Sequence, residues 1–143
     1  MEAALEEARA AAARGEVPVG AVVTDAAGRL LARAGNEVEA RRDPSAHAEI
    51  LAMRAAAAAL GDKHLSGCTL HVTLEPCAMC AQAASLFRVA RVVFAAYDPK
   101  GGGVEHGARV FSHPTCHHAP EVVGGLREGE AAALLRGFFA GKR

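Results

Sequence analysis

The chain has 143 residues, which suits one domain with a core of its own and is too short for two. Hydrophobic residues make up 51% of the chain and aromatic residues only 4%, a composition that excludes a disordered protein and predicts a compact core of small aliphatic side chains. Lys plus Arg and Asp plus Glu are balanced at 16 each, so the net charge provides no general attraction to nucleic acid or to a membrane.

The N-terminal region and the cysteines predict a cytoplasmic protein. Residues 1–15 are acidic and rich in Ala, without the basic and apolar regions of a secretion signal. No apolar run approaches the length of about 18 residues that a membrane span needs, so we expect no membrane partner. In the cytosol, the four cysteines are more often metal ligands or catalytic groups than disulfides.

The first half of the chain predicts a helix, a hairpin and a second helix. Residues 2–14 are strong helix formers, and Gly15 follows where a C-terminal cap would lie. Two aliphatic runs flank the turn sequence DAAG at 25–28, which predicts two antiparallel strands. Residues 36–45 are polar, and the composition of residues 46–61 predicts a second helix that ends at its terminal glycine.

The second half of the chain predicts alternating strands and helices. Residues 68–75 (CTLHVTLE) form a short β-rich run that leads directly into a helix at 77–87, with Pro76 at the junction. The remaining predicted elements are a strand at 90–97, a Gly-rich loop at 98–107, a short strand at 121–125 and a helix at 128–139. A hairpin followed by this alternation predicts an α/β sandwich with a mixed sheet.

Two short motifs, HAE and PCAMC, open the second and third predicted helices. In open α/β sheets such helix starts gather at the carboxyl edge of the strands, where ligands bind. Cys77 and Cys80 are three positions apart, and a helix N-terminus favours their thiolate forms. With a neutral nitrogen of His47 they form a zinc site with three protein ligands, which leaves the fourth position for water, as in a catalytic site.

Glu49 is predicted to transfer protons beside this metal. It lies two residues from His47, too close to share its helical face, so it is not an obvious fourth ligand. It can take a proton from the metal-activated water, pass it to a ring nitrogen and later protonate the departing amine, which describes hydrolytic deamination. The combined H-x-E and P-C-x-x-C pattern is the known signature of the zinc nucleobase deaminases.

Other interpretations of these residues remain open on the sequence alone. The C-x-x-C pair is also compatible with a thioredoxin-like dithiol, which would leave HAE without a role. A closed structural zinc site would recruit Cys116 or His117 as a fourth ligand. The cluster at 113–118 is compatible with a second metal site, although a loop held by side-chain hydrogen bonds is favoured. Cys68 is expected to be a small buried hydrophobe, and Asn36 after a glycine is also typical of a turn.

From residue 16 to residue 139 the sequence resembles the bacterial tRNA-specific adenosine deaminases. The shared stretches are EVPVGAV (16–22), Gly35-Asn36, DPSAHAEI (43–50), VTLEPCAMC (72–80), RVVF (91–94), Asp98, His113-Pro114 and Phe138-Phe139. The resemblance implies a three-layer α/β/α cytidine-deaminase-like fold with a mixed five-stranded sheet, as a single zinc-dependent deaminase domain over residues 1–143. It also implies a homodimer and conversion of adenosine to inosine at the wobble position of a tRNA anticodon loop.

By position, the resemblance assigns roles to individual residues. His47, Cys77 and Cys80 would bind one Zn²⁺ per subunit, with an activated water as nucleophile and Glu49 as proton shuttle. The implied substrate contacts are Asn36, Val17, the backbone of Ala48, Asp98, Lys100, His113 and Phe138. Bases of an anticodon loop are already unpaired, so extruding one costs less than opening a duplex.

The sequence is also compatible with two alternatives to a tRNA deaminase. Many relatives carry a basic residue where this chain has Tyr97, and a different loop where it has GGGVEHG at 101–107. With the neutral net charge, these departures motivate a deaminase of a free base or nucleoside such as guanine, cytosine or cytidine. Tyr97 would replace a charge by stacking on a base, worth about 1–3 kcal/mol. The second alternative is a zinc-stabilised binding module without turnover, which would have four protein ligands at the metal.

Overall fold

A computed structural model describes residues 1–142 of the chain, and its five strands form one sheet in the order β2-β1-β3-β4-β5. The elements in chain order are α1 (Glu2–Ala13), β1 (Gly20–Thr24), β2 (Leu30–Gly35), α2 (Val38–Arg41), α3 (Ala48–Leu60), β3 (Thr69–Leu74), α4 (Ala78–Leu86), β4 (Arg91–Ala96), the 3₁₀-helix η1 (Val110–Ser112), β5 (Glu121–Gly124) and α5 (Glu128–Ala140). Strand β1 is antiparallel to β2 and to β3, whereas β3, β4 and β5 are parallel. The predicted mixed five-stranded sheet is confirmed.

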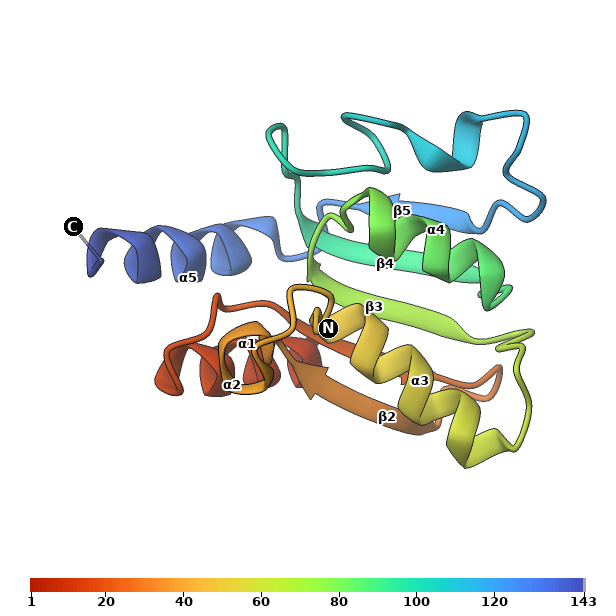
Figure 1. Ribbon diagram of the computed structural model, residues 1–143, viewed down its shortest axis with the longest axis horizontal. Helices are drawn as coiled ribbons and strands as arrows, with labels where there is room; N and C mark the ends of the chain where they lie inside the picture. Colours follow the sequence, from red (N-terminus) through yellow and green to blue (C-terminus); the bar gives the residue numbers. More distant parts are fainter. Residues whose placement is uncertain (143) are drawn as a thin grey trace.

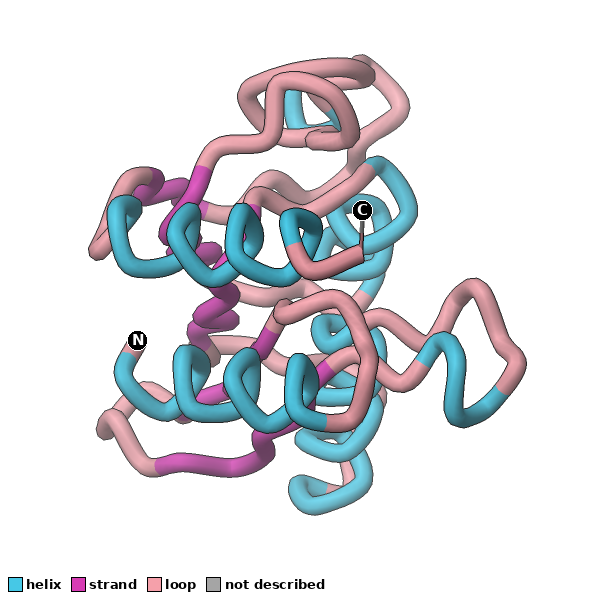
Figure 2. The backbone as a smooth tube through the Cα atoms, turned by 90° about the vertical axis from the view of Figure 1, so that its left-hand side faces the viewer, coloured by secondary structure: helices cyan, strands magenta, loops and turns pink. Residues whose placement is uncertain are grey.

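Helices cover both faces of this sheet (Figures 1 and 2). Helices α3 and α4 bury their small side chains with Met53 against Leu70, Val72 and Phe94, in the larger of two cores. Helices α1 and α5 lie side by side on the other face, where Leu5 packs with Ala95, Ala96 and Ala131. The architecture is therefore the expected α/β/α sandwich, with thin layers because alanine provides much of the contact surface.

Several chain segments meet at one edge of the sheet, the edge at which the parallel strands β3 and β4 end. Strands β2, β3 and β4 all run toward this edge, whereas β1 starts from it, as the pairing of Gly20 with Gly35 and of Ala21 with Val72 shows. The residues that follow β2, β3 and β4, and those that precede β1, therefore meet. Because α3 and α4 also begin there, the edge collects both motifs, as predicted from the general behaviour of α/β sheets.

Local sequence explains most element boundaries. The hairpin turn is confirmed: Asp25 accepts backbone hydrogen bonds from Ala27 and Arg29, and Gly28 has a φ of +83°. Helix α3 ends at Gly61 in the left-handed conformation, as its sequence predicts. The third predicted helix begins later than expected, at Ala78, so Cys77 is its extended N-cap and not part of its first turn.

The short elements α2 and η1 are missing from the sequence prediction. Helix α2 has four residues and η1 has three, too few for a periodic pattern. Both lie in segments for which the sequence predicts no helix or strand, and α2 is held by Glu16, which lies far from it in the chain.

Helices α1 and α5 are joined by ion pairs at the surface. Arg127 contacts Glu2 at 2.6 Å, and Arg9 lies 3.8 Å from Glu130. All four side chains are partly exposed, so each pair contributes little to stability. Helix α5 extends beyond the sheet toward its own C-terminal end (Figure 1). Among residues 1–142, no helix combines the length and the apolar character that crossing a membrane requires.

Candidate metal centre and its cavity

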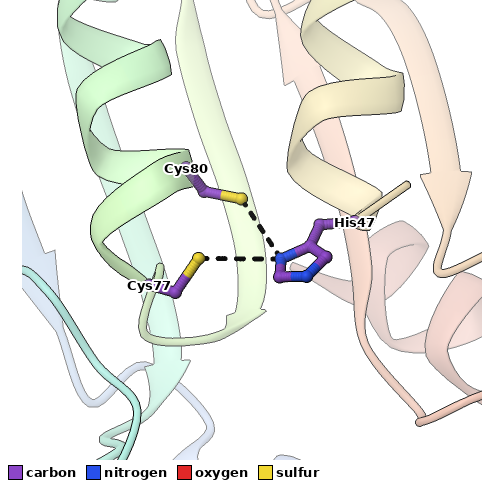
Figure 3. A group of neighbouring side chains, drawn as sticks. All are labelled: His47, Cys77 and Cys80. Carbon is purple, nitrogen blue, oxygen red and sulfur yellow. Dashed lines mark hydrogen bonds between the residues drawn. The ribbon is translucent and has the colours of Figure 1, made fainter. Parts of the chain in front are cut away.

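Three donor atoms from two helix starts meet at the sheet edge (Figure 3). His47 Nδ1 lies 3.6 Å from Cys77 Sγ and 3.5 Å from Cys80 Sγ. His47 is the N-cap of α3 and Cys77 is the N-cap of α4, and both have extended backbone dihedrals. This geometry turns both side chains toward each other across the gap between the helices, although Cys77 itself is not helical.

The donor group fits a tetrahedral zinc ion. With Zn–S of about 2.3 Å and Zn–N of about 2.0–2.1 Å, tetrahedral angles place nitrogen and sulfur about 3.5–3.6 Å apart. The two nitrogen–sulfur distances match that separation, and the three donor atoms all lie within 4.8 Å of one another. Two thiolates and one imidazole are also the ligand types that zinc prefers.

No fourth protein ligand joins the group within the described residues. Cys116 Sγ instead lies 3.2 Å from the backbone oxygen of His118, and His118 Nε2 lies 2.7 Å from the oxygen of Val89. The cluster at 113–118 is therefore the favoured loop held by side-chain hydrogen bonds, and the closed zinc site with Cys116 or His117 is not formed. Cys68, only 1% exposed, is the small buried residue that its sequence position predicts.

The environment of the cysteines favours a thiolate. Both helix N-termini carry a partial positive charge that faces the sulfur atoms. A hydrogen bond from Cys80 lowers the pKa of Cys77 to about 4, with help from His47, whereas the same hydrogen bond and burial raise the pKa of Cys80. The hydrogen bond with Cys77 in turn raises the pKa of His47. Without a metal, the pair therefore holds its first negative charge on Cys77.

Glu49 lies in the first turn of α3, on the edge of the same cavity and outside the donor group. Its side chain is only 4% exposed, and burial raises the pKa of Glu49 to about 7. A buried carboxyl group with such a pKa can both hold and release a proton near neutral pH. The predicted position of Glu49 beside the metal, and not on it, agrees with this geometry.

A cavity of about 650 Å³ opens over the donor group. Its walls come from the segment before β1, the ends of β2, β3 and β4, and the C-terminal end of α5. The lining residues are Gly15, Glu16, Val17, Val19, Asn36, Val38, Glu39, His47, Glu49, Leu74, Glu75, Cys77, Asp98, Gly101, Phe138, Phe139 and Lys142. The size suits a small molecule or one base, since ligand cavities have volumes of about 300–1,000 Å³.

The structure brings four of the seven expected substrate contacts to this cavity: Val17, Asn36, Asp98 and Phe138. Lys100 lies next to it, in an adjoining hollow of about 490 Å³ that Tyr97 also lines. His113 is exposed and does not line either space, and its Nε2 faces the backbone oxygen of Ala108. Ala48 is fully buried and lines neither space, and its N–H group is bound within the protein.

The partner of that N–H group is Asn36, which is buried. Its side-chain oxygen accepts the Ala48 N–H at 2.8 Å, at the start of α3, and its backbone oxygen accepts a hydrogen bond from Arg14. Within the described residues its Nδ2 group has no hydrogen-bond partner and so remains available to a ligand in the cavity. The Ala48 N–H group, predicted as a base contact, is therefore already bound to Asn36 in this structure.

Asn36→Ala is expected to lower the free energy of unfolding by about 1–3 kcal/mol, because it leaves the buried N–H of Ala48 without an acceptor. Urea denaturation followed by circular dichroism measures this loss. Asn36→Asp is the matched variant: it keeps the acceptor oxygen at a helix N-terminus, so most of the stability should return. Equal losses in the two variants would show that the hydrogen bond to α3 is not the cause.

The sequence analysis assigned no site role to two buried acidic residues of the cavity, Glu16 and Glu75, which are both 2% exposed. The carboxylate of Glu16 accepts the N–H groups of Glu39 and Ala40 at 3.0 and 2.9 Å, and so fixes α2. Burial alone would raise the pKa of Glu75, but hydrogen bonds from the Asp98 backbone and from His106 lower the pKa of Glu75 below its usual value. In the sequence, the only feature that could have indicated these two buried carboxylates is an acidic residue beside an apolar run and a proline, as in EVPVG and in TLEPC.

Comparisons with known proteins give consistent results. Residues 1–96 match the family described as the cytidine and deoxycytidylate deaminase zinc-binding region. The chain is 56% identical to the tRNA-specific adenosine deaminase of Agrobacterium fabrum, over 100% of this chain and 93% of that one. A solved structure from studies of A-to-I editing by tRNA:A34 deaminases at the wobble position superposes with a TM-score of 0.92 and 55% identity, covering 94% and 97% of the two chains. A guanine deaminase of Nitrosomonas europaea superposes with a TM-score of 0.77 and 31% identity, covering 96% and 81%.

Proposed function

This chain belongs to the cytidine and deoxycytidylate deaminase family, and from its similarity to tRNA-specific adenosine deaminases we propose that it converts adenosine to inosine at the wobble position of a tRNA. It is a zinc-dependent hydrolytic deaminase. The observation that carries the reaction is that Glu49 lies in the same cavity as the donor group of His47 and Cys77. The choice of substrate is supported by the similarity over the full chain to tRNA-specific adenosine deaminases.

The residues of the site divide the chemistry between them. His47, Cys77 and Cys80 would hold the zinc ion, which when bound supplies an activated water as nucleophile. Glu49 takes a proton from that water and passes it to the ring nitrogen next to the reacting carbon. It then moves a proton to the exocyclic amine, so the new carbon–oxygen bond replaces the carbon–nitrogen bond and ammonia leaves. The products are inosine and ammonia, which balances adenosine and water.

The cavity walls would orient the base. Asn36 offers its Nδ2 group as a hydrogen-bond donor, and Val17 offers an apolar surface. A cavity of about 650 Å³ takes one base that has left its stack, which an anticodon loop provides without opening a duplex. Asp98, Lys100 and Phe138 would contact the RNA next to that base. Because His113 lies outside the cavity, its contact would be with a more distant part of the loop.

A free base is the second candidate substrate, most specifically guanine. The similarity to the guanine deaminase of Nitrosomonas europaea favours it, as does the balance of 16 acidic and 16 basic residues. Tyr97 would suit either substrate, because it offers an aromatic face without a charge beside the cavity.

A direct assay separates the two candidates. The zinc-loaded protein is incubated with an anticodon stem-loop that carries a wobble adenosine, and inosine is measured by nuclease digestion and mass spectrometry. A stem-loop with guanosine at the same position is the matched control, and ammonia release is measured with free guanine, cytosine and cytidine. Inosine formation only in the first RNA supports the proposal. Ammonia release from a free base, together with an unchanged stem-loop, would replace it with the second candidate.

We also propose that the chain is one deaminase domain that acts in the cytoplasm as a homodimer. The outer face of α4 exposes Met79 and Leu86, with exposed fractions of 40% and 68%. Large apolar side chains on the outer face of a helix next to the site suit coverage by a second copy. Sedimentation equilibrium at micromolar concentration should give twice the mass of the chain, and a single-chain mass would contradict the dimer.

A further inference from the structure

Glu75 is a buried carboxylate at the end of β3, and every hydrogen bond it accepts comes from one loop. Its Oε1 accepts the Asp98 N–H at 3.0 Å and contacts His106 Nδ1 at 2.8 Å. Its Oε2 accepts the N–H groups of Val104, Glu105 and His106 at 2.9–3.2 Å. Five donors therefore hold the segment 98–106 onto a single side chain that has no solvent-exposed surface.

Two glycines let this loop lie close to the carboxylate and to the metal ligands. A Cβ atom at Gly102 would overlap the carboxylate of Glu75. A Cβ atom at Gly103 would lie 2.5 Å from the Ala78 nitrogen and 2.8 Å from the carbonyl carbon of Cys77, and the Gly103 N–H bonds to the oxygen of Pro76 at 2.7 Å. The loop thus packs directly on the first turn of α4, with no side chain between them.

The same loop forms one wall of the cavity. Asp98 and Gly101 line the cavity, and Asp98 binds Glu75 through its own backbone. His106 also packs edge-on against Tyr97, which lines the adjoining hollow, with ring centres 6.1 Å apart. The position of this wall relative to the metal is therefore set by Glu75, although Glu75 carries no group that reacts.

We propose that Glu75 is a positioning residue that determines how tightly the substrate is held, by fixing the loop 98–106 against the metal-binding helix. The inference rests on the proposed function for its substrate, the anticodon stem-loop. It differs from the roles of Glu49 and of the zinc ligands, because the carboxylate acts only through the loop. Its loss changes substrate binding while the zinc ion and the proton shuttle remain in place.

Glu75→Gln tests this with the smallest change in shape. A glutamine amide has one acceptor oxygen, so if that oxygen stays with residues 104–106 the Asp98 N–H loses its acceptor, and His106 Nδ1 keeps a partner only by changing its tautomer. We expect KM for the stem-loop to rise on the order of tenfold, with kcat changed by less than about threefold. Glu75→Asp, which keeps the charge on a shorter side chain, should show a smaller rise in KM.

Two further variants keep the test valid if Glu75→Gln folds poorly. His106→Phe removes one of the five donors and keeps a ring beside Tyr97, so KM should rise in the same direction by a smaller factor. Glu105→Gln is the matched control: its side chain is exposed and only its backbone N–H meets Glu75, so its KM and kcat should equal those of the wild type.

Hydrogen exchange and zinc content complete the experiment without any substrate. In Glu75→Gln the amides of Asp98 and of residues 104–106 should exchange faster, while one zinc per chain remains bound. A purely structural role would instead lower zinc content and apparent kcat through a smaller folded fraction, with KM unchanged, and that result would overturn the inference, as would unchanged exchange. If wild-type protein fails on the stem-loop but deaminates a free base, the proposed substrate is wrong, and KM for that base then decides on Glu75.

Discussion

Glu49→Ala is expected to lower kcat by about 10²–10⁴-fold while the protein keeps its zinc ion. The loss follows from the position of Glu49, which lies in the cavity beside the donor group and outside it. The other two buried carboxylates of the cavity, Glu16 and Glu75, are occupied by backbone N–H groups. They are therefore poorly placed to replace a missing proton carrier.

Single-turnover measurements with the stem-loop, together with metal analysis of the same sample, check this prediction. Glu49→Gln is the matched variant, since it keeps the size and polarity of the side chain and removes only its ability to carry the proton. Both variants should lose activity to a similar extent and bind one zinc per chain. Turnover within a few-fold of the wild type in either variant would remove Glu49 from the mechanism.

Cys80→Ala should lose zinc and stability together. Cys80 is completely buried and supplies one of only three protein donors, so its removal should weaken zinc binding by more than the roughly 10–100-fold that loss of an outer-shell partner costs. Zinc at 1,000 times its dissociation constant stabilises the folded protein by about 4 kcal/mol, and this contribution disappears with the metal. Calorimetric unfolding and metal content, measured on the same preparation, report both losses.

The control is Cys68→Ala, because Cys68 is also buried but lies just before β3 and outside the donor group. It should keep a full equivalent of zinc and lose only the packing of one sulfur atom. Chelation of the wild-type protein should lower its unfolding temperature to a value near that of Cys80→Ala. Full zinc occupancy in Cys80→Ala would contradict the ligand assignment.

Much of the fold follows from local sequence. Gly61, with its left-handed conformation, ends α3, and Asp25 with Gly28 sets the hairpin, because these signals act within a few residues. Helix α2 is different. Its four residues have no pattern of their own, and its N-terminal N–H groups depend on Glu16, 23 residues earlier in the chain. Such an element is stabilised by tertiary contacts, and local composition does not reveal them.

In the candidate site, too, some residues follow from local sequence patterns and others only from tertiary contacts. His47, Glu49 and the two cysteines were found because metal and proton chemistry require particular side chains at particular spacings. Glu75 was not found, because its partners are mostly backbone N–H groups, up to 31 residues away, and any residue except proline provides such a group. The sequence shows which side chains can do chemistry, whereas the fold shows which backbone groups a carboxylate holds.

Two walls of the cavity, the loop 98–106 and the end of α5, are held in place by groups that differ in their exposure to salt. The loop wall is fastened to a carboxylate without solvent contact, where dissolved ions have little influence. Another wall is the C-terminal end of α5, and the N-terminal end of that helix is joined to α1 by partly exposed pairs such as Arg127 with Glu2, which added salt weakens. Rising salt is therefore expected to weaken the ion pairs between α5 and α1 before it affects the loop that Glu75 holds.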